Sequence, residues 1–153
     1  MRPLIHNRHC GFTLVEVVVV VMILGILAAI AAPRVLGAAD AATENSARQT
    51  LSVIREAIDS YAAQHPNELP GADGLHATFT ADLKDYLRGA AFPKCPVGPA
   101  NNNSVRMMAG SGSITADMTT ESTHSWVYKY QTGEFHINCD DATNDGSTTY
   151  DQL

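Results

Sequence analysis

The first third of the chain carries two successive patterns of hydrophobic residues. The first is a continuous apolar run from Val17 to Ala32, and the 21 residues from Phe12 to Ala32 contain a single charge, Glu16. An α-helix rises about 1.5 Å per residue, so a helix of this length crosses a hydrocarbon core of about 30 Å. The run therefore predicts a helix over residues 12–33 that can span a membrane.

The second pattern is amphipathic. Beyond Pro33, apolar residues recur at alternating spacings of four and three, which places them on one face of a helix. These residues are Ala47, Leu51, Ile54, Ile58 and Tyr61. Glu44 and Arg48 are four residues apart, the spacing at which an ion pair forms along a helix. Pro66 ends the pattern, so we expect residues 34–66 to form an amphipathic continuation of the same helix.

Residues 67–153 are rich in turn formers and predict a small head. Aromatic and β-branched residues alternate on both sides of Gly133, which predicts a β-hairpin at about 126–138. We also expect a short helix at 80–87 and a short strand at 105–108. The expected fold class is α+β, with a long N-terminal helix whose C-terminal half packs on a small antiparallel sheet.

The net charge of −6 is unevenly distributed along the chain. The first eleven residues include Arg2 and Arg8 and no acid, so the chain from Phe12 onward sums to 8 − 16 = −8. This acidic head lacks the basic face that nucleic-acid binding requires. Basic residues before an apolar helix keep the N-terminus in the cytoplasm, so we expect the head to lie on the other side of the membrane.

On the residues alone, the N-terminal segment has more than one interpretation. It resembles a cleaved secretory signal peptide with small residues at 29–31, although the apolar run is long and Pro33 follows closely. It also fits a plain single-span anchor of a membrane-anchored or secreted binding protein. Neither interpretation explains Glu16, because a carboxylate in hydrocarbon costs about 3 kcal/mol and needs a partner.

A third interpretation rests on a motif at residues 11–16, Gly-Phe-Thr-Leu-Val-Glu, which follows a short basic segment and opens the apolar helix. It resembles the signal of type IV pilins and pseudopilins. The resemblance implies that a prepilin peptidase removes residues 1–11 as a leader, cutting after Gly11, and N-methylates Phe12. It also implies that Glu16 pairs with the Phe12 amine of a neighbouring subunit and sets the register between subunits.

Two further positions match the same resemblance. The glycine and the proline found in the helix of that family correspond to Gly25 and Pro33. Glycine is a poor helix former, and proline removes a backbone donor and clashes with the carbonyl four residues earlier. The resemblance therefore implies that the stretch between them can unwind inside a filament.

The resemblance implies a structural function. We expect a subunit of a pilus-like filament, most simply a pseudopilin of a type II secretion system, that is inserted in the inner membrane with a periplasmic head. It then polymerises with other copies or homologous subunits on an inner-membrane assembly platform to form a periplasmic pseudopilus. The alternative within this class is a cell-surface type IV or minor pilin used in adhesion, motility or DNA uptake.

The cysteines allow one disulfide in the head. Cys10 lies in the basic segment, whereas Cys95 and Cys139 lie in the part that we expect to be exported. Disulfides persist in oxidising compartments, and closing a loop of this size stabilises a fold by about 4 kcal/mol in the chain-entropy model. We therefore predict a Cys95–Cys139 disulfide if the head is exported.

The acidic C-terminal tail is the one candidate for a metal. Oxygen ligands gather around Gly146 in the manner of calcium loops, namely Asp140, Asp141, Asn144 and Asp145. Major pseudopilins bind calcium near the C-terminus, but this tail does not match their pattern. We favour a solvated acidic tail without cofactor. No histidine pair has zinc spacing, and no nucleophile or phosphate-loop motif is present, so we do not expect an enzyme.

Overall fold

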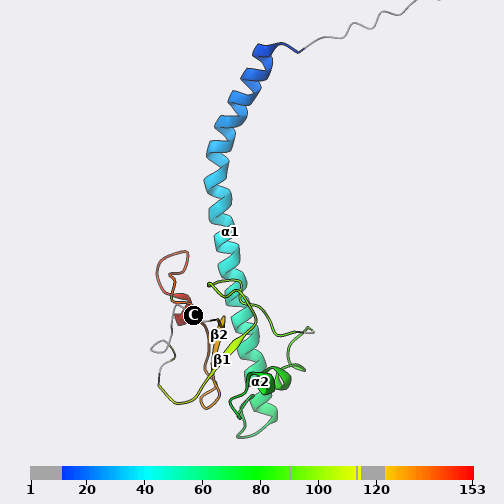
Figure 1. Cartoon of the computed structure of the whole chain (residues 1–153), viewed down its shortest axis with the longest axis vertical. Coiled ribbons are helices and arrows are strands. Elements are labelled where there is room, and N and C mark those ends of the chain that lie inside the picture. Colours follow the sequence, from blue (N-terminus) through cyan, green and yellow to red (C-terminus); the bar gives the residue numbers. More distant parts are fainter. Residues whose placement is uncertain (1–11, 90, 113, 115–122) are drawn as a thin grey trace, which may run out of the picture. The chain divides into compact units, whose positions relative to one another are not determined.

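The computed structural model describes residues 12–89, 91–112, 114 and 123–153. The chain divides into two compact units, Met1–Ala39 and Asp40–Leu153, and the boundary falls inside the long helix α1. In chain order the elements are α1, α2, β1, β2, β3 and the short 3₁₀ helix η2 (Tyr150–Gln152), and Figure 1 shows their arrangement. The fold class is α+β, as predicted.

Helix α1 extends over Leu14–Gln64 and begins inside the motif at residues 11–16. The backbone N–H of Glu16 donates to Oγ1 of Thr13 at 3.2 Å, which is the N-cap interaction. Thr13 and Glu16 are three residues apart in the sequence, which is the spacing of a capping box. Because this cap fixes the start of the helix, α1 begins two residues later than the predicted start at Phe12.

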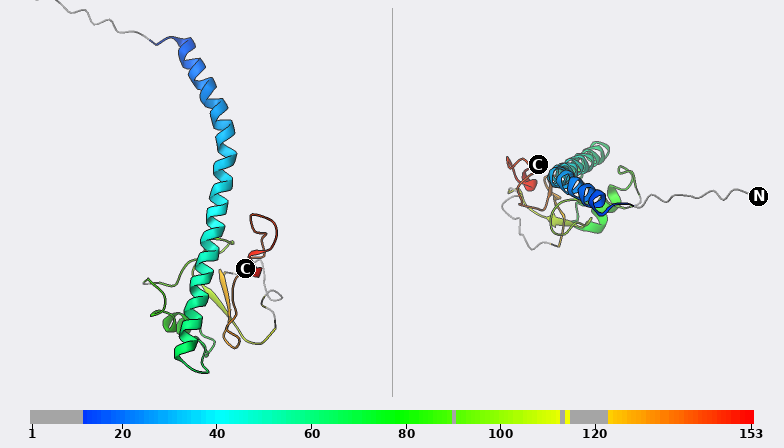
Figure 2. Two further views of the ribbon diagram at one scale, coloured as in Figure 1. Left: turned by 180° about the vertical axis from the view of Figure 1, so that it is seen from behind. Right: turned by 90° about the horizontal axis from the view of Figure 1, so that it is seen from above.

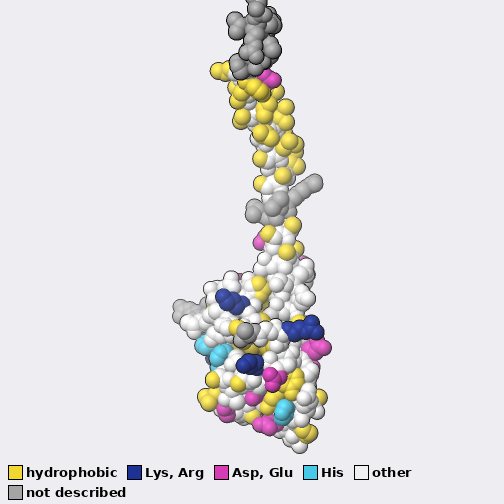
Figure 3. Space-filling model, turned by 90° about the vertical axis from the view of Figure 1, so that its right-hand side faces the viewer, with side chains coloured by type: hydrophobic (Ala, Val, Ile, Leu, Met, Phe, Trp, Pro, Cys, Tyr) yellow, Lys and Arg dark blue, Asp and Glu magenta, His cyan; other side chains and the backbone are white. Residues whose placement is uncertain are grey.

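The described part of the first unit is apolar and lies open. Every large hydrophobic side chain from Phe12 to Ile30 is exposed, and Phe12 and Leu14 are 76% and 80% exposed. Figure 3 shows hydrophobic side chains covering this segment. In the described residues, α1 is the one helix long and apolar enough to cross a membrane. The side chains of residues 33–36 are not described.

The second unit forms its core on the apolar stripe of α1. All five residues predicted for that stripe are buried in a single cluster, which confirms the prediction. Trp126, Tyr128, Phe135 and Ile137 of the hairpin belong to the same cluster. The ring centroid of Phe135 lies 5.2 Å from that of Trp126 and 6.2 Å from that of Tyr128. Figures 1 and 2 show β2 beside this half of α1.

The sheet contains β1 (Val105–Met108), β2 (Trp126–Lys129) and β3 (Phe135–Ile137), in that order. β2 and β3 pair antiparallel, as predicted for the hairpin, but β1 pairs parallel to β2. The prediction of a purely antiparallel sheet is therefore wrong, and the sheet is mixed. Residues 109–125 connect β1 to β2, and a connection of this length permits the crossover that parallel pairing requires.

Helix α2 spans His76–Asp82. The prediction of a short helix at 80–87 is therefore wrong in its position, because the helix begins four residues earlier. The reason lies at Asp73, whose carboxylate accepts the N–H of Leu75 at 2.9 Å and the hydroxyl of Thr78 at 2.6 Å. This side chain organises the turn before the helix and starts it early. Thr80 lies inside the helix, where its hydroxyl donates to the carbonyls of His76 and Ala77.

Candidate functional site

The predicted assembly site lies at the start of α1. Gly11, the predicted cleavage position, lies outside the described residues. Phe12 is exposed and precedes the capped first turn, in which Glu16 is the one acid. A carboxylate in the first turn of a helix is favoured by the positive end of the helix dipole. The local backbone structure is therefore compatible with a glutamate at this point in an otherwise apolar segment.

Glu16 is chemically unusual in its surroundings. It is exposed, its neighbours along the helix are valines, and it has no ion-pair partner among the residues that the structure describes. A carboxylate carried into lipid or protein from such a position requires a cation or a set of hydrogen-bond donors. An amine at Phe12, one helical turn away in sequence, belongs to the right chemical class. Pairing across subunits stays a prediction.

The two predicted flexibility positions both fall inside α1. A Cβ added at Gly25 would meet no atom within 4 Å, so close packing does not explain the glycine. Pro33 is assigned to the helix, where its ring has no N–H to donate. The unwinding of this stretch in a filament stays a prediction.

The two head cysteines are buried free thiols in the structure, so the predicted disulfide is not formed in it. Both belong to the core cluster. Gly98, three residues after Cys95, packs on Cys139, because a Cβ there would lie 3.2 Å from the Cβ of that cysteine. Cys139 Sγ instead donates to Oδ2 of Asp141 at 3.3 Å.

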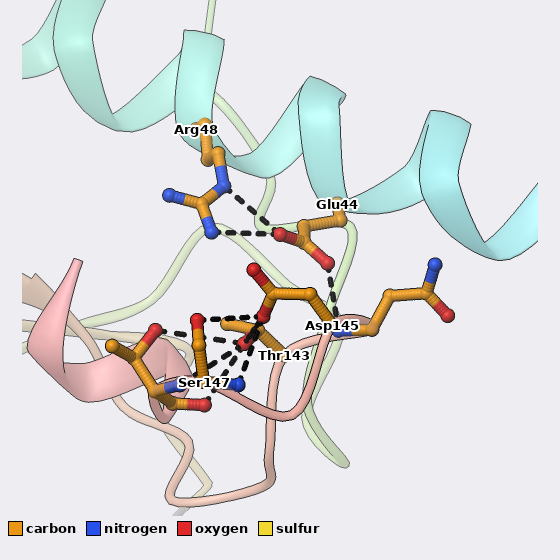
Figure 4. A network of polar contacts seen from close by, with 7 residues as sticks. Glu44, Arg48, Thr143, Asp145 and Ser147 are labelled. Carbon is orange, nitrogen blue, oxygen red and sulfur yellow. Dashed lines mark hydrogen bonds and ion pairs between the residues drawn. The ribbon is translucent and has the colours of Figure 1, made fainter.

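A polar network that the sequence did not reveal joins α1 to the C-terminal tail (Figure 4). Oε1 of Glu44 accepts Nε and Nη2 of Arg48 at 3.0 and 2.7 Å, which confirms that predicted pair. Oε2 of Glu44 accepts the backbone N–H of Asn144 at 2.8 Å, across 100 residues of sequence. The carboxylate is buried, and this second bond explains why a glutamate is tolerated there.

Arg55 forms a second set of long-range hydrogen bonds. Its Nε and Nη2 donate to the carbonyl of Phe135 at 3.0 and 2.8 Å, and its Nη1 donates to the carbonyl of Leu153 at 2.8 Å. Burial lowers the pKa of Arg55 below its usual range without removing its charge. The guanidinium thus fastens β3 and the last residue to the same face of α1. Nothing in the sequence pattern distinguishes it from a solvated arginine.

The comparisons with known proteins agree with the motif and the fold. Residues 6–32 match the prokaryotic N-terminal methylation motif. The chain is 35% identical over 101 residues to type II secretion system core protein G of Pseudomonas aeruginosa, covering 63% of this chain and 71% of the relative. It is 32% identical over 101 residues to the proteins of the same name from Aeromonas hydrophila and Vibrio cholerae, covering 71% and 69% of them.

A methylation motif on a long apolar helix, followed by a small α+β head, defines the class of type IV pilin-like proteins. Within that class the chain belongs to the type II secretion system core protein G family, so the prediction of a pseudopilin is confirmed. No solved structure gives a significant match to the chain.

Proposed function

We propose that this pseudopilin is cleaved after Gly11, N-methylated on Phe12 and polymerised from the inner membrane into a periplasmic pseudopilus. Its role is structural and non-enzymatic. Its partners are other copies or homologous subunits, the prepilin peptidase that processes it and the inner-membrane platform that assembles it. The observation that supports this proposal most directly is Glu16, the single carboxylate of the exposed apolar segment 12–32.

The exposed segment must be covered by something other than water. Burying one large aliphatic side chain stabilises a state by about 1.5–3 kcal/mol, and the large side chains from Phe12 to Ile30 are all exposed. Lipid covers them before assembly, and the same surface of neighbouring subunits covers them in the filament. The basic leader and the acidic remainder favour an orientation with the head in the periplasm.

Glu16 supplies the specificity that apolar packing lacks. Contacts between aliphatic side chains allow one helix to slide along another, whereas an ion pair in a low-dielectric surrounding has one favourable position. Cleavage before Phe12 creates an amine that faces the same desolvation cost as the carboxylate. On this proposal each incoming subunit docks where its amine meets Glu16 of a neighbour, or the reverse.

The test is filament assembly by Glu16 variants in cells that hold the prepilin peptidase and the secretion machinery. Glu16→Gln retains the size of the side chain and removes its charge, and we expect membrane insertion to persist while recovered filament falls at least about tenfold, the loss equivalent to about 1.4 kcal/mol per contact. Glu16→Leu should behave alike. Normal assembly of either variant would contradict the proposal.

Thr13→Ala is the matched control. It removes the Oγ1 that caps α1 and leaves the charge of Glu16 in place. We expect a cost of about 1 kcal/mol at the helix start and a smaller loss of filament than with Glu16→Gln. An equal loss in both variants would indicate that the helix cap, and not the charge, is what assembly requires.

A further inference from the structure

The C-terminal tail offers a test of whether this head needs a calcium ion. Calcium takes six to eight oxygen ligands at about 2.3–2.6 Å, with carboxylates that are free to turn toward it. The sequence offers four side chains for this purpose, Asp140, Asp141, Asn144 and Asp145. The question is whether the oxygens of these residues are available in the folded loop.

The carboxylate of Asp145 is already engaged. Its Oδ1 accepts the hydroxyl of Thr143 at 2.7 Å, the backbone N–H of Ser147 at 3.0 Å and the hydroxyl of Ser147 at 2.8 Å. The bond from Thr143 is the main cause that lowers the pKa of Asp145 to about 2, with the bonds from Ser147 next. Three donors aimed at one oxygen already stabilise the anion at neutral pH, as a cation would.

The other acids of the tail do not form a ligand set with Asp145. Oδ2 of Asp141 accepts the thiol of Cys139. Within the described part of the chain, no three histidine, cysteine, aspartate or glutamate residues are grouped closely enough to hold a metal ion. The carboxylates of Asp141 and Asp145 therefore accept hydrogen bonds from S–H, N–H and O–H groups, whereas a cation site would leave carboxylate oxygens free to coordinate the ion.

The loop is closed by its own backbone and by α1. Thr143 N–H donates to the carbonyl of Thr148 at 2.9 Å, and Gly146 N–H donates to the carbonyl of Thr143 at 2.8 Å. Asn144 N–H, between them, is the group that donates to Glu44. Glu44 is held in turn by Arg48, so a buried and neutralised carboxylate fixes the loop to the helix (Figure 4).

We propose that the C-terminal loop of this pseudopilin is held in place by Glu44 from α1 and by the turn around Asp145, and needs no calcium ion. Glu44 is a positioning residue that acts on the loop through the backbone of Asn144. Calcium would have to displace hydrogen bonds that are already formed at Asp145. The stability of the head should then be the same with calcium and without it.

The first experiment is thermal unfolding of the full-length protein in detergent, in calcium chloride and in excess chelator. The proposal predicts one Tm within error in both conditions. A rise of several degrees in calcium would overturn it, whatever the behaviour of any variant.

The second experiment uses variants under the same two conditions. Glu44→Gln should lower Tm by roughly 5–10 °C, because a buried charged hydrogen bond is weakened, and should speed hydrogen exchange of the Asn144 amide. Glu56→Gln, at an exposed acid of the same helix, should change neither. Fast exchange of Asn144 in the unmodified protein, or an unchanged rate in Glu44→Gln, would contradict the role of Glu44.

Asp145→Asn distinguishes the turn from a metal site. On the proposal it lowers Tm by the same amount in calcium and in chelator, since only hydrogen bonds to Thr143 and Ser147 are weakened. A variant that abolishes a calcium-dependent part of Tm would show that Asp145 is a ligand and that the proposal is wrong.

Discussion

The two units of this chain differ in the sequence separation of the contacts that organise them. In residues 12–39 the described side chains are exposed, and the features that matter lie within a few residues of each other, at Thr13 and Glu16. In residues 40–153 the decisive contacts join residues 80 to 100 positions apart, as Arg55 and Glu44 do. The first unit is thus specified locally, whereas the second depends on tertiary packing.

Because of this difference, we expect mutations in the two units to affect different properties of the protein. A change at Glu16 removes a charge that the described residues do not pair, so it should leave the stability of the head unaltered. A change in the head core should lower stability and leave the N-terminal motif intact for processing. The following predictions test that separation, beginning with the largest expected effect.

Ile54→Ala should destabilise the head by about 2–5 kcal/mol, because Ile54 is fully buried among the stripe residues and a cavity replaces part of its side chain. Denaturant unfolding of the full-length protein in detergent measures this. Val53→Ala, one residue away and 44% exposed, is the control and should change stability by less than about 0.5 kcal/mol. Cleavage before Phe12 should be unaffected in both, and a processing defect in Ile54→Ala would break the comparison.

Arg55→Met should cost about 1.5–3 kcal/mol, because the carbonyls of Phe135 and Leu153 lose charged donors while the aliphatic bulk is kept. Arg88→Met, at an exposed arginine, controls for the loss of one positive charge. The same denaturant experiment reports both. Equal stability of the two variants would mean that the hydrogen bonds of Arg55 do not hold β3 to α1.

The buried thiols predict a smaller effect at alkaline pH. Burial raises the pKa of Cys95 to about 11 and that of Cys139 to about 12. In the unfolded chain both thiols ionise near pH 9, so the unfolded state loses its protons first and the free energy of unfolding falls as pH rises above about 9. Cys95→Ala with Cys139→Ala should flatten that fall between about pH 9 and 11. An unchanged slope would contradict the assignment to these thiols.

Alkylation of the same residues decides between thiols and a disulfide. With free thiols, native protein at neutral pH reacts slowly and denatured protein reacts at both cysteines without reductant. If the exported head contains the predicted Cys95–Cys139 bond, denatured protein reacts only after reduction. Peptide mass spectrometry reads the outcome at each cysteine.

The elements that could be predicted from the sequence are those that periodicity and local motifs encode. The stripe from Ala47 to Tyr61 was predicted because helical spacing alone identifies a buried face, and the hairpin because alternation flanks a turn glycine. The capping role of Thr13 was missed, although the spacing of Thr13 and Glu16 is a recognisable signal.

The errors occurred where distant groups decide the structure. The parallel pairing of β1 with β2 is a tertiary arrangement, and strand propensity does not encode the direction in which two strands pair. The early start of α2 depends on the Asp73 side chain, which accepts hydrogen bonds from Leu75 and Thr78 in the turn before the helix. The start predicted from the sequence is Thr80 instead. The hydrogen bond from the backbone N–H of Asn144 to Glu44 joins a loop to a helix. The residue types at these two positions do not predict it.

The mass of the mature N-terminus tests the account most directly. Protein purified from cells with an active prepilin peptidase should begin at Phe12 and bear one methyl group on its amine. Protein that keeps residues 1–11, or begins near Ala32, would contradict the account, because no amine would then exist one helical turn from Glu16.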